Sequence, residues 1–113
     1  MEIKKYPFKN HKPILGKDCY LSPGVKLIGQ VELGDNVNIW FNSVVRGDVN
    51  KVVIGKNTNI QDLSMLHVVE ELPLLIGDNV SVGHSVILHA CTIKNSCLIG
   101  MGATVLDLSL IHI

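Results

Sequence analysis

The sequence predicts an all-β fold: a parallel β-helix of hexapeptide repeats, wound into triangular coils of about 18 residues. One observation is an aliphatic residue at every sixth position along most of the chain. Another is a set of small or branched residues four positions after each of these. Finally, aromatic residues make up only 4% of the chain whereas Ile, Val and Leu are abundant, which suits strand ladders better than a helical bundle.

After an N-terminal lead-in at residues 1–14, fifteen aliphatic residues mark the first inward track. They are Leu15, Leu21, Leu27, Leu33, Ile39, Val45, Ile54, Ile60, Leu66, Ile76, Val82, Leu88, Ile93, Ile99 and Val105. The second track, which we also expect to point inward, is Cys19, Val25, Val31, Val37, Ser43, Val49, Thr58, Ser64, Val80, Val86, Cys97 and Ala103. Two of the three cysteines therefore fall on the inward track as buried thiols, and Cys91 lies off it.

The hexads group in threes, which gives the coils their triangular shape. One set of sides reads LGKDCYL, LGDNVNI, IGKNTNI, IGDNVSV and IKNSCLI. The extra residues all precede this set, so we expect loops at one corner, at Asp48–Val53 and Val69–Leu75. Glycine and the Asp-Asn or Lys-Asn pairs beside it are turn chemistry. The β-helix domain is predicted to span residues 15–107.

The last six residues, 108–113, read LSLIHI. This string resembles the translation of a transposon end that is used to prepare sequencing libraries. We expect a non-native tail on a C-terminally truncated chain, so that His112 carries no functional weight. An ordinary apolar last strand is the alternative interpretation.

Composition excludes several classes of function. Ten basic and ten acidic side chains cancel, so nothing indicates a nucleic-acid or membrane-binding surface. The N-terminus lacks the apolar segment of a secretory signal, and no apolar run reaches the length of a spanning helix. Three cysteines without a CxxC motif favour free thiols. We expect a cytoplasmic protein.

Two histidines fall in one column of the predicted helix. In the third set of sides, the residues that follow the inward aliphatic are Ile28, Arg46, His67, His89 and Leu106. Neighbouring coils lie about 4.8 Å apart, so His67 and His89 can share one metal ion, with Arg46 directly below them. Isolated surface histidines are the alternative interpretation.

A third histidine, His84, belongs to the second set of sides and stacks over Asp62. It lies around a corner from His89 and is not expected to meet the other two within one chain. A neighbouring copy could present it, because three-fold closure brings one patch against a different patch. Three imidazoles with an open fourth position are typical of catalytic zinc, which suits hydration or hydrolysis of an electrophilic carbon.

The segments NIWFNSVVRGDVNKVVIGKNTNIQD, MLHV, VGHSVILHACTI and GMGATVLD resemble the γ-class carbonic anhydrase-like family of hexapeptide proteins. The resemblance covers residues 12–107. It implies a left-handed β-helix and a homotrimer with metal ions between subunits. It also implies that His67, His84 and His89 are the metal ligands.

The resemblance assigns further residues to the site. Arg46 and Asp48 would form an inter-subunit salt bridge, with a purely structural role as the alternative. Gln61 would orient a metal-bound hydroxide or bicarbonate, with Asp62 beside it. Asn59 is a weaker candidate for the same pocket. For Gln61 and Asp62 the alternative is polarity of a turn.

The sequence departs from the family at three places. Leu63 stands where a glycine usually follows the NIQD motif. Val49 stands where the best-known active members carry a proton-shuttling glutamate. Glu70 and Glu71 in the second loop could replace it or could simply be solvated charges. The family's usual C-terminal helix does not follow.

These features predict a carbonic anhydrase-like lyase that hydrates carbon dioxide to bicarbonate reversibly. A metal-dependent thioesterase or other hydrolase on the same scaffold, and a non-catalytic, metal-stabilised assembly subunit, are the alternatives. A hexapeptide acyltransferase would need no set of three ligands. Zn²⁺ is the expected metal, with Fe²⁺ and Co²⁺ as substitutes that accept the same imidazoles.

Overall fold

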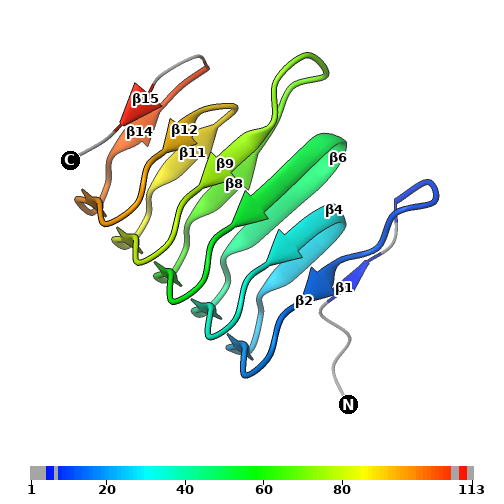
Figure 1. Cartoon of the computed structure of the whole chain (residues 1–113), viewed down its shortest axis with the longest axis horizontal. Helices are drawn as coiled ribbons and strands as arrows, with labels where there is room; N and C mark the ends of the chain where they lie inside the picture. The colour runs from blue at the N-terminus through cyan, green and yellow to red at the C-terminus, as the bar shows by residue number, and fades with distance from the viewer. Residues whose placement is uncertain (1–4, 7, 108–109, 112–113) are drawn as a thin grey trace.

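The computed structural model describes residues 5–6, 8–107 and 110–111. Within these residues the chain forms short strands and no helix, stacked as successive coils between the two termini (Figure 1). The strands are β1 Lys5–Tyr6, β2 Ile14–Leu15, β3 Tyr20–Leu21, β4 Lys26–Leu33, β5 Asn38–Ile39, β6 Val44–Ile54, β7 Asn59–Ile60, β8 Met65–His67, β9 Leu74–Ile76, β10 Ser81–Val82, β11 Ile87–His89, β12 Thr92–Ile93, β13 Leu98–Ile99, β14 Thr104–Val105 and β15 Leu110–Ile111.

All strand pairs are parallel and join each coil to the next. One ladder contains β5, β7, β10 and their neighbours β3 and β13. The other two are the β8–β11–β14 side and the β9–β12–β15 side, and they meet because the long strands β4 and β6 run through both. The predicted parallel β-helix is confirmed.

The interior contains both predicted tracks. From Leu27 to Ile99 every residue of the first track is at most 5% exposed. On the second track, Val25, Val37, Val80 and Val86 have no exposed surface. The prediction for Val49 is wrong, since this residue is 45% exposed. It lies where the inserted residues carry β6 away from the coil.

All three cysteines are free, as expected. Cys97 is buried and Cys19 is partly buried with its Sγ 3.2 Å from the carbonyl oxygen of Gly34. Cys91, which lies outside both tracks, is only 2% exposed. It sits at the corner between β11 and β12, where the coil is one residue short, and burial raises the pKa of its thiol to about 11.

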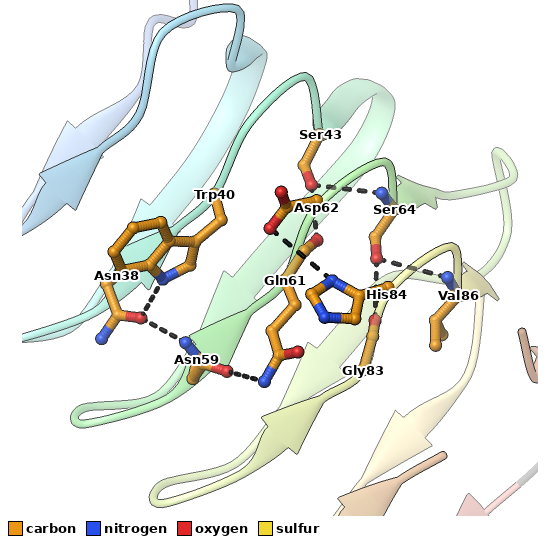
Figure 2. A network of polar contacts seen from close by, with 10 residues as sticks. All are labelled: Asn38, Trp40, Ser43, Asn59, Gln61, Asp62, Ser64, Gly83, His84 and Val86. Atoms are coloured by element: carbon orange, nitrogen blue, oxygen red, sulfur yellow. Dashed lines mark hydrogen bonds and ion pairs between the residues drawn. The ribbon is translucent and has the colours of Figure 1, made fainter. Parts of the chain in front are cut away.

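Three buried hydroxyl groups connect one coil to the next. The Oγ of Ser43 donates to the carbonyl of Gln61 at 2.8 Å and accepts from the amide of Ser64 at 3.1 Å. The Oγ of Ser64 repeats this arrangement with Gly83 and Val86 (Figure 2). The Thr58 hydroxyl donates to a carbonyl oxygen in the same way. Polar residues can therefore occupy the inward track, because each hydroxyl is satisfied by the next coil.

The corners depend on left-handed backbone conformations. One corner uses Asp18, Asn36, Asn57, Asn79 and Ser96, all with φ near +60°. These residue types tolerate that conformation better than most. At the next corner the same conformation falls on Gly24, Asn42, Leu63, Ser85 and Gly102.

The glycines after the inward aliphatic residues serve close approach rather than a left-handed turn. A Cβ on Gly34 would lie 2.7 Å from the amide nitrogen of Lys56, and one on Gly55 would lie 2.5 Å from the carbonyl carbon of Gly77. In the turns predicted for the Gly-Asp-Asn segments, two different residues therefore have separate roles. Glycine admits the neighbouring coil, and the residue two positions later takes the positive φ.

The two insertions have different structures. Asp48–Val53 continues β6 as an extended arm, whereas the second insertion closes through an antiparallel bridge between Val69 and Leu72. The Asn50 side chain donates to the carbonyl of Glu70 at 3.0 Å, which joins the two arms. Both arms project at one corner of the coils (Figure 1).

At the N-terminal end, β1 belongs to the predicted lead-in, yet it pairs with β4 and so extends the ladder before the predicted start of the domain. At the other end, β15 adds a parallel strand to β12. Residues 108, 109, 112 and 113 of the predicted tail, including His112, lie outside the described residues. In the part of the chain that the structure describes, no helix is long and apolar enough to cross a membrane.

Candidate metal centre

His67 and His89 occupy adjacent positions on neighbouring strands, as predicted. β8 and β11 pair so that these two residues are register partners. Their ring centroids lie 5.3 Å apart with an angle of 62° between the rings. Both residues follow a buried leucine on their strand, so the packing of the core holds their backbones one coil apart.

His67 is held on both ring nitrogens. Its Nδ1 lies 3.4 Å from an Nη2 atom of Arg46, and its Nε2 lies 2.9 Å from Oδ1 of Asp48. The Nε of Arg46 is 3.2 Å from Oδ2 of Asp48 but is not aligned for a hydrogen bond, so these two attract mainly by charge. The two RGD residues thus meet within one chain.

The carboxylate of Asp48 is stabilised in its ionised form. Burial by itself would raise its pKa, but the hydrogen bonds with His67 and the amide of Val49 act in the opposite direction. The positive charge of Arg46 adds to them, so the pKa of Asp48 is held below its ordinary value. The negative charge of Asp48 is therefore balanced by its neighbours His67 and Arg46.

His89 has a carboxylate partner of its own. Its Nδ1 lies 2.5 Å from Oδ1 of Asp107, in the turn after β14. Because this contact uses Nδ1, the nitrogen on the far side of the ring, Nε2, is the one that can bind a metal ion. A carboxylate on the second ring nitrogen is the usual arrangement of metal-binding histidines.

His84 lies on another side of the triangle, after β10. Its Nδ1 is 3.6 Å from Oδ1 of Asp62, which confirms the predicted stacking of these two residues. Its side chain is 52% exposed. Among the described residues, no group of three or more His, Cys, Asp or Glu side chains is arranged to hold a metal ion. One chain therefore brings together two of the three expected imidazoles.

A chain of amides lies beside His84. The Nε1 of Trp40 donates to Oδ1 of Asn38 at 2.6 Å, and Nδ2 of Asn59 donates to the same oxygen. In turn, Nε2 of Gln61 donates to Oδ1 of Asn59 at 2.9 Å (Figure 2). A shallow pocket of about 340 Å³ is lined by Trp40, Asn59, Gln61, Asp62 and His84.

Three residues of this region escaped the sequence analysis. Asn38 and Trp40 flank the inward Ile39, and the register of Asn38 with Asn59 could have indicated the amide chain. Asp107 directly follows Leu106, the last residue of the histidine column. It lies one coil beyond His89 and one position past the histidine column, so its contact joins diagonal rather than directly stacked neighbours.

The donor set is chemically suited to a divalent transition metal. Imidazole nitrogen is a preferred ligand of zinc, iron and cobalt. Catalytic zinc commonly has three protein ligands, and the His67–His89 pair could provide two of them. His84 is exposed, with its Nδ1 3.6 Å from Asp62, so the described residues fit a centre that a second chain would complete.

The parallel ladders and the six-residue period define the class of this protein as a hexapeptide-repeat β-helix. The family described as "Bacterial transferase hexapeptide (six repeats)" matches residues 12–47. The crystal structure of a proposed acetyltransferase from Bacillus cereus superposes with a TM-score of 0.90 at 45% identity, covering 91% of this chain and 60% of that one.

Two curated relatives specify the family further. The mitochondrial gamma carbonic anhydrase 2 of Arabidopsis thaliana is 46% identical over 84% of this chain and 36% of its own length. A carbonic anhydrase of Geobacillus kaustophilus is 45% identical over 90% of this chain and 56% of its own length. The chain belongs to the γ-class carbonic anhydrase-like family of left-handed parallel β-helix proteins. It spans 36% and 56% of the length of these two relatives.

Proposed function

We propose that this chain is a subunit of a metal-dependent γ-class carbonic anhydrase, which hydrates carbon dioxide to bicarbonate reversibly. The observation that carries the proposal is the pairing of His67 with His89 at 5.3 Å on one side of the coil, while His84 stands exposed on another. Relatives with 45–46% identity are named carbonic anhydrases. A homotrimer would bring the two sides together at each subunit boundary.

The three histidines would hold the metal ion, with His67 and His89 from one chain and His84 from the next. When bound, a divalent zinc, iron or cobalt ion would lower the pKa of a coordinated water to about 7 and so supply hydroxide near neutral pH. Asp107 is hydrogen-bonded to Nδ1 of His89, and Oδ1 of Asp62 lies 3.6 Å from Nδ1 of His84, so Nε2 of each ring would be the metal-binding atom. His67 must first release one of its two ring contacts, to Arg46 or to Asp48.

Gln61 would position the reacting oxygen. Its Nε2 is engaged by Asn59, which is itself held by Asn38, so the orientation of the amide is fixed. The amide oxygen Oε1 of Gln61 is then free to accept a hydrogen bond from a hydroxyl group of the reactant in the pocket. The pocket volume of about 340 Å³ accommodates a molecule as small as carbon dioxide.

A non-catalytic, metal-stabilised subunit is the second candidate. The observation that favours it is Val49, which is exposed at the position where active members of the family carry a proton-shuttling glutamate.

Glu70 is exposed on the second arm, which Asn50 joins to the arm that carries Val49. If Glu70 moves protons instead, Glu70→Gln would slow turnover in weak buffer, and added imidazole buffer would restore it.

Stopped-flow measurement of carbon dioxide hydration by the zinc-loaded protein tests the proposal. We expect His67→Ala and His89→Ala each to abolish metal binding and hydration. His11→Ala, a histidine remote in sequence from the column, is the control and should keep both. A wild-type protein that binds three metal ions per trimer but accelerates hydration no more than zinc-free protein would support the non-catalytic candidate instead.

A further inference from the structure

Asp107 is a carboxylate that the repeat does not require. Leu88 pairs with Val105, and continuing this register places Ala90 beside Asp107. The corresponding residue one coil earlier is Val68, and both Val68 and Ala90 are buried. Asp107 instead places its carboxylate 2.5 Å from Nδ1 of His89. Asp107 is itself exposed, so packing of the β-helix does not determine its side chain, and the contact with His89 is what distinguishes the carboxylate.

The contact determines which ring nitrogen of His89 carries the proton. A neutral imidazole has one N–H, and an ionised carboxylate can only accept a hydrogen bond. Beside Asp107, the proton of His89 therefore sits on Nδ1, and the lone pair on Nε2 faces away from the carboxylate. The same contact also fixes the rotation of the His89 ring. The His67 ring is held instead by its contacts with Arg46 and Asp48.

We propose that Asp107 is a positioning residue of the candidate metal centre, which holds His89 with Nε2 ready to bind a divalent metal ion. This inference rests on the proposed function. It gives the turn after β14, which contains Asp107, a role in the metal centre. Carboxylates in this position typically improve metal affinity by about 10–100-fold, because they orient the ring and raise its basicity.

The test uses the full chain with Asp107→Ala and Asp107→Asn. The asparagine Oδ1 still accepts a hydrogen bond from Nδ1, whereas alanine cannot. Glu32→Ala, which removes an exposed carboxylate from β4, is the matched control. Long-range ¹H–¹⁵N NMR of the metal-free protein reports the tautomer of His89, and competition with a chelator reports the dissociation constant for Zn²⁺. Circular dichroism verifies that each variant is folded.

We expect wild type, Asp107→Asn and Glu32→Ala to keep the Nδ1–H tautomer of His89. Asp107→Ala should lose this tautomer preference and bind Zn²⁺ about 10–100-fold more weakly, with a smaller loss in Asp107→Asn. An Asp107→Ala protein with unchanged tautomer and unchanged Zn²⁺ affinity would overturn the role of Asp107 while leaving the proposed function intact. A wild-type protein that binds no Zn²⁺ would overturn both, and the tautomer measurement would then show whether the hydrogen bond itself exists.

Discussion

Leu63 adopts a left-handed backbone conformation that is unfavourable for a leucine. Its φ is +62°, and its side chain is 62% exposed, so the left-handed conformation gains no compensating burial. Branched or bulky residues adopt this region at a cost of about 1–2 kcal/mol. The equivalent corners use Gly24 and Gly102, for which the conformation is free of this cost.

Leu63→Gly should therefore stabilise the protein by about 0.5–1 kcal/mol, after allowing for the greater freedom of glycine in the unfolded chain. Urea unfolding at a fixed protein concentration measures the change. Leu98→Gly is the control, because Leu98 is even more exposed but lies in strand β13. That variant should lose stability. Equal destabilisation by both substitutions would show that the left-handed corner is not strained.

Cys91 should be the least reactive of the three thiols. Burial, together with the nearby charge of Asp107, raises the pKa of Cys91 to about 11. At pH 8 only about one molecule in a thousand would then carry the thiolate, which is the nucleophile. Iodoacetamide labelling followed by peptide mass spectrometry should modify the partly buried Cys19 first and Cys91 last. Early labelling of Cys91 in the folded protein would contradict this burial.

At the scale of the strands, glycine controls the spacing between coils. A Cβ on Gly55 would approach the carbonyl carbon of Gly77 to 2.5 Å, closer than real Cβ atoms lie, whereas a Cβ on Gly100 would meet nothing within 4 Å. The ladder at β6 and β9 must therefore open if Gly55 acquires a side chain.

Gly55→Ala should destabilise the protein by about 1–3 kcal/mol, the usual cost of overpacking. Gly100→Ala, the matched control, should change stability by no more than about 0.5 kcal/mol. Thermal unfolding of the two variants provides the comparison. Equal stability of both proteins would mean that the coils adjust their spacing without cost.

The strand level is also where the sequence was most informative. A six-residue period encodes both the inward face and the register, so the stacking of His67 on His89 and of His84 on Asp62 followed from counting. The prediction for Val49 failed because the insertion redirects the backbone outward, although Val49 still lies four positions after an inward aliphatic residue. Asp107 was not predicted because it lies one position past the histidine column, and its contact with His89 depends on the rotamers of both side chains.

The amide chain of the pocket could be predicted only in part. The column that contains Asn38 and Asn59 follows from the repeat, but the hydrogen bond from Trp40 depends on a rotamer. Sequence periodicity specifies which backbone positions are neighbours. It does not specify which polar atoms of those neighbours meet.

At the scale of the whole molecule, the proposed metal centre needs more than one chain. In a single chain, Asp48 occupies Nε2 of His67, and His84 lies around a corner beside Asp62. Assembly would supply the missing imidazole, so metal binding and trimer formation should stabilise each other. Each metal site would then be shared between two copies of the chain.

The most direct test is to mix two inactive variants, His67→Ala and His84→Ala, in equal amounts and let their subunits exchange. A boundary is intact when one chain keeps His67 and His89 and the next keeps His84. Random mixing in a three-fold ring makes about a quarter of all boundaries intact. We expect each variant alone to bind no Zn²⁺, and the mixture to bind about a quarter of the wild-type amount by native mass spectrometry. A mixture that forms mixed trimers and still binds no Zn²⁺ would contradict a site shared between copies.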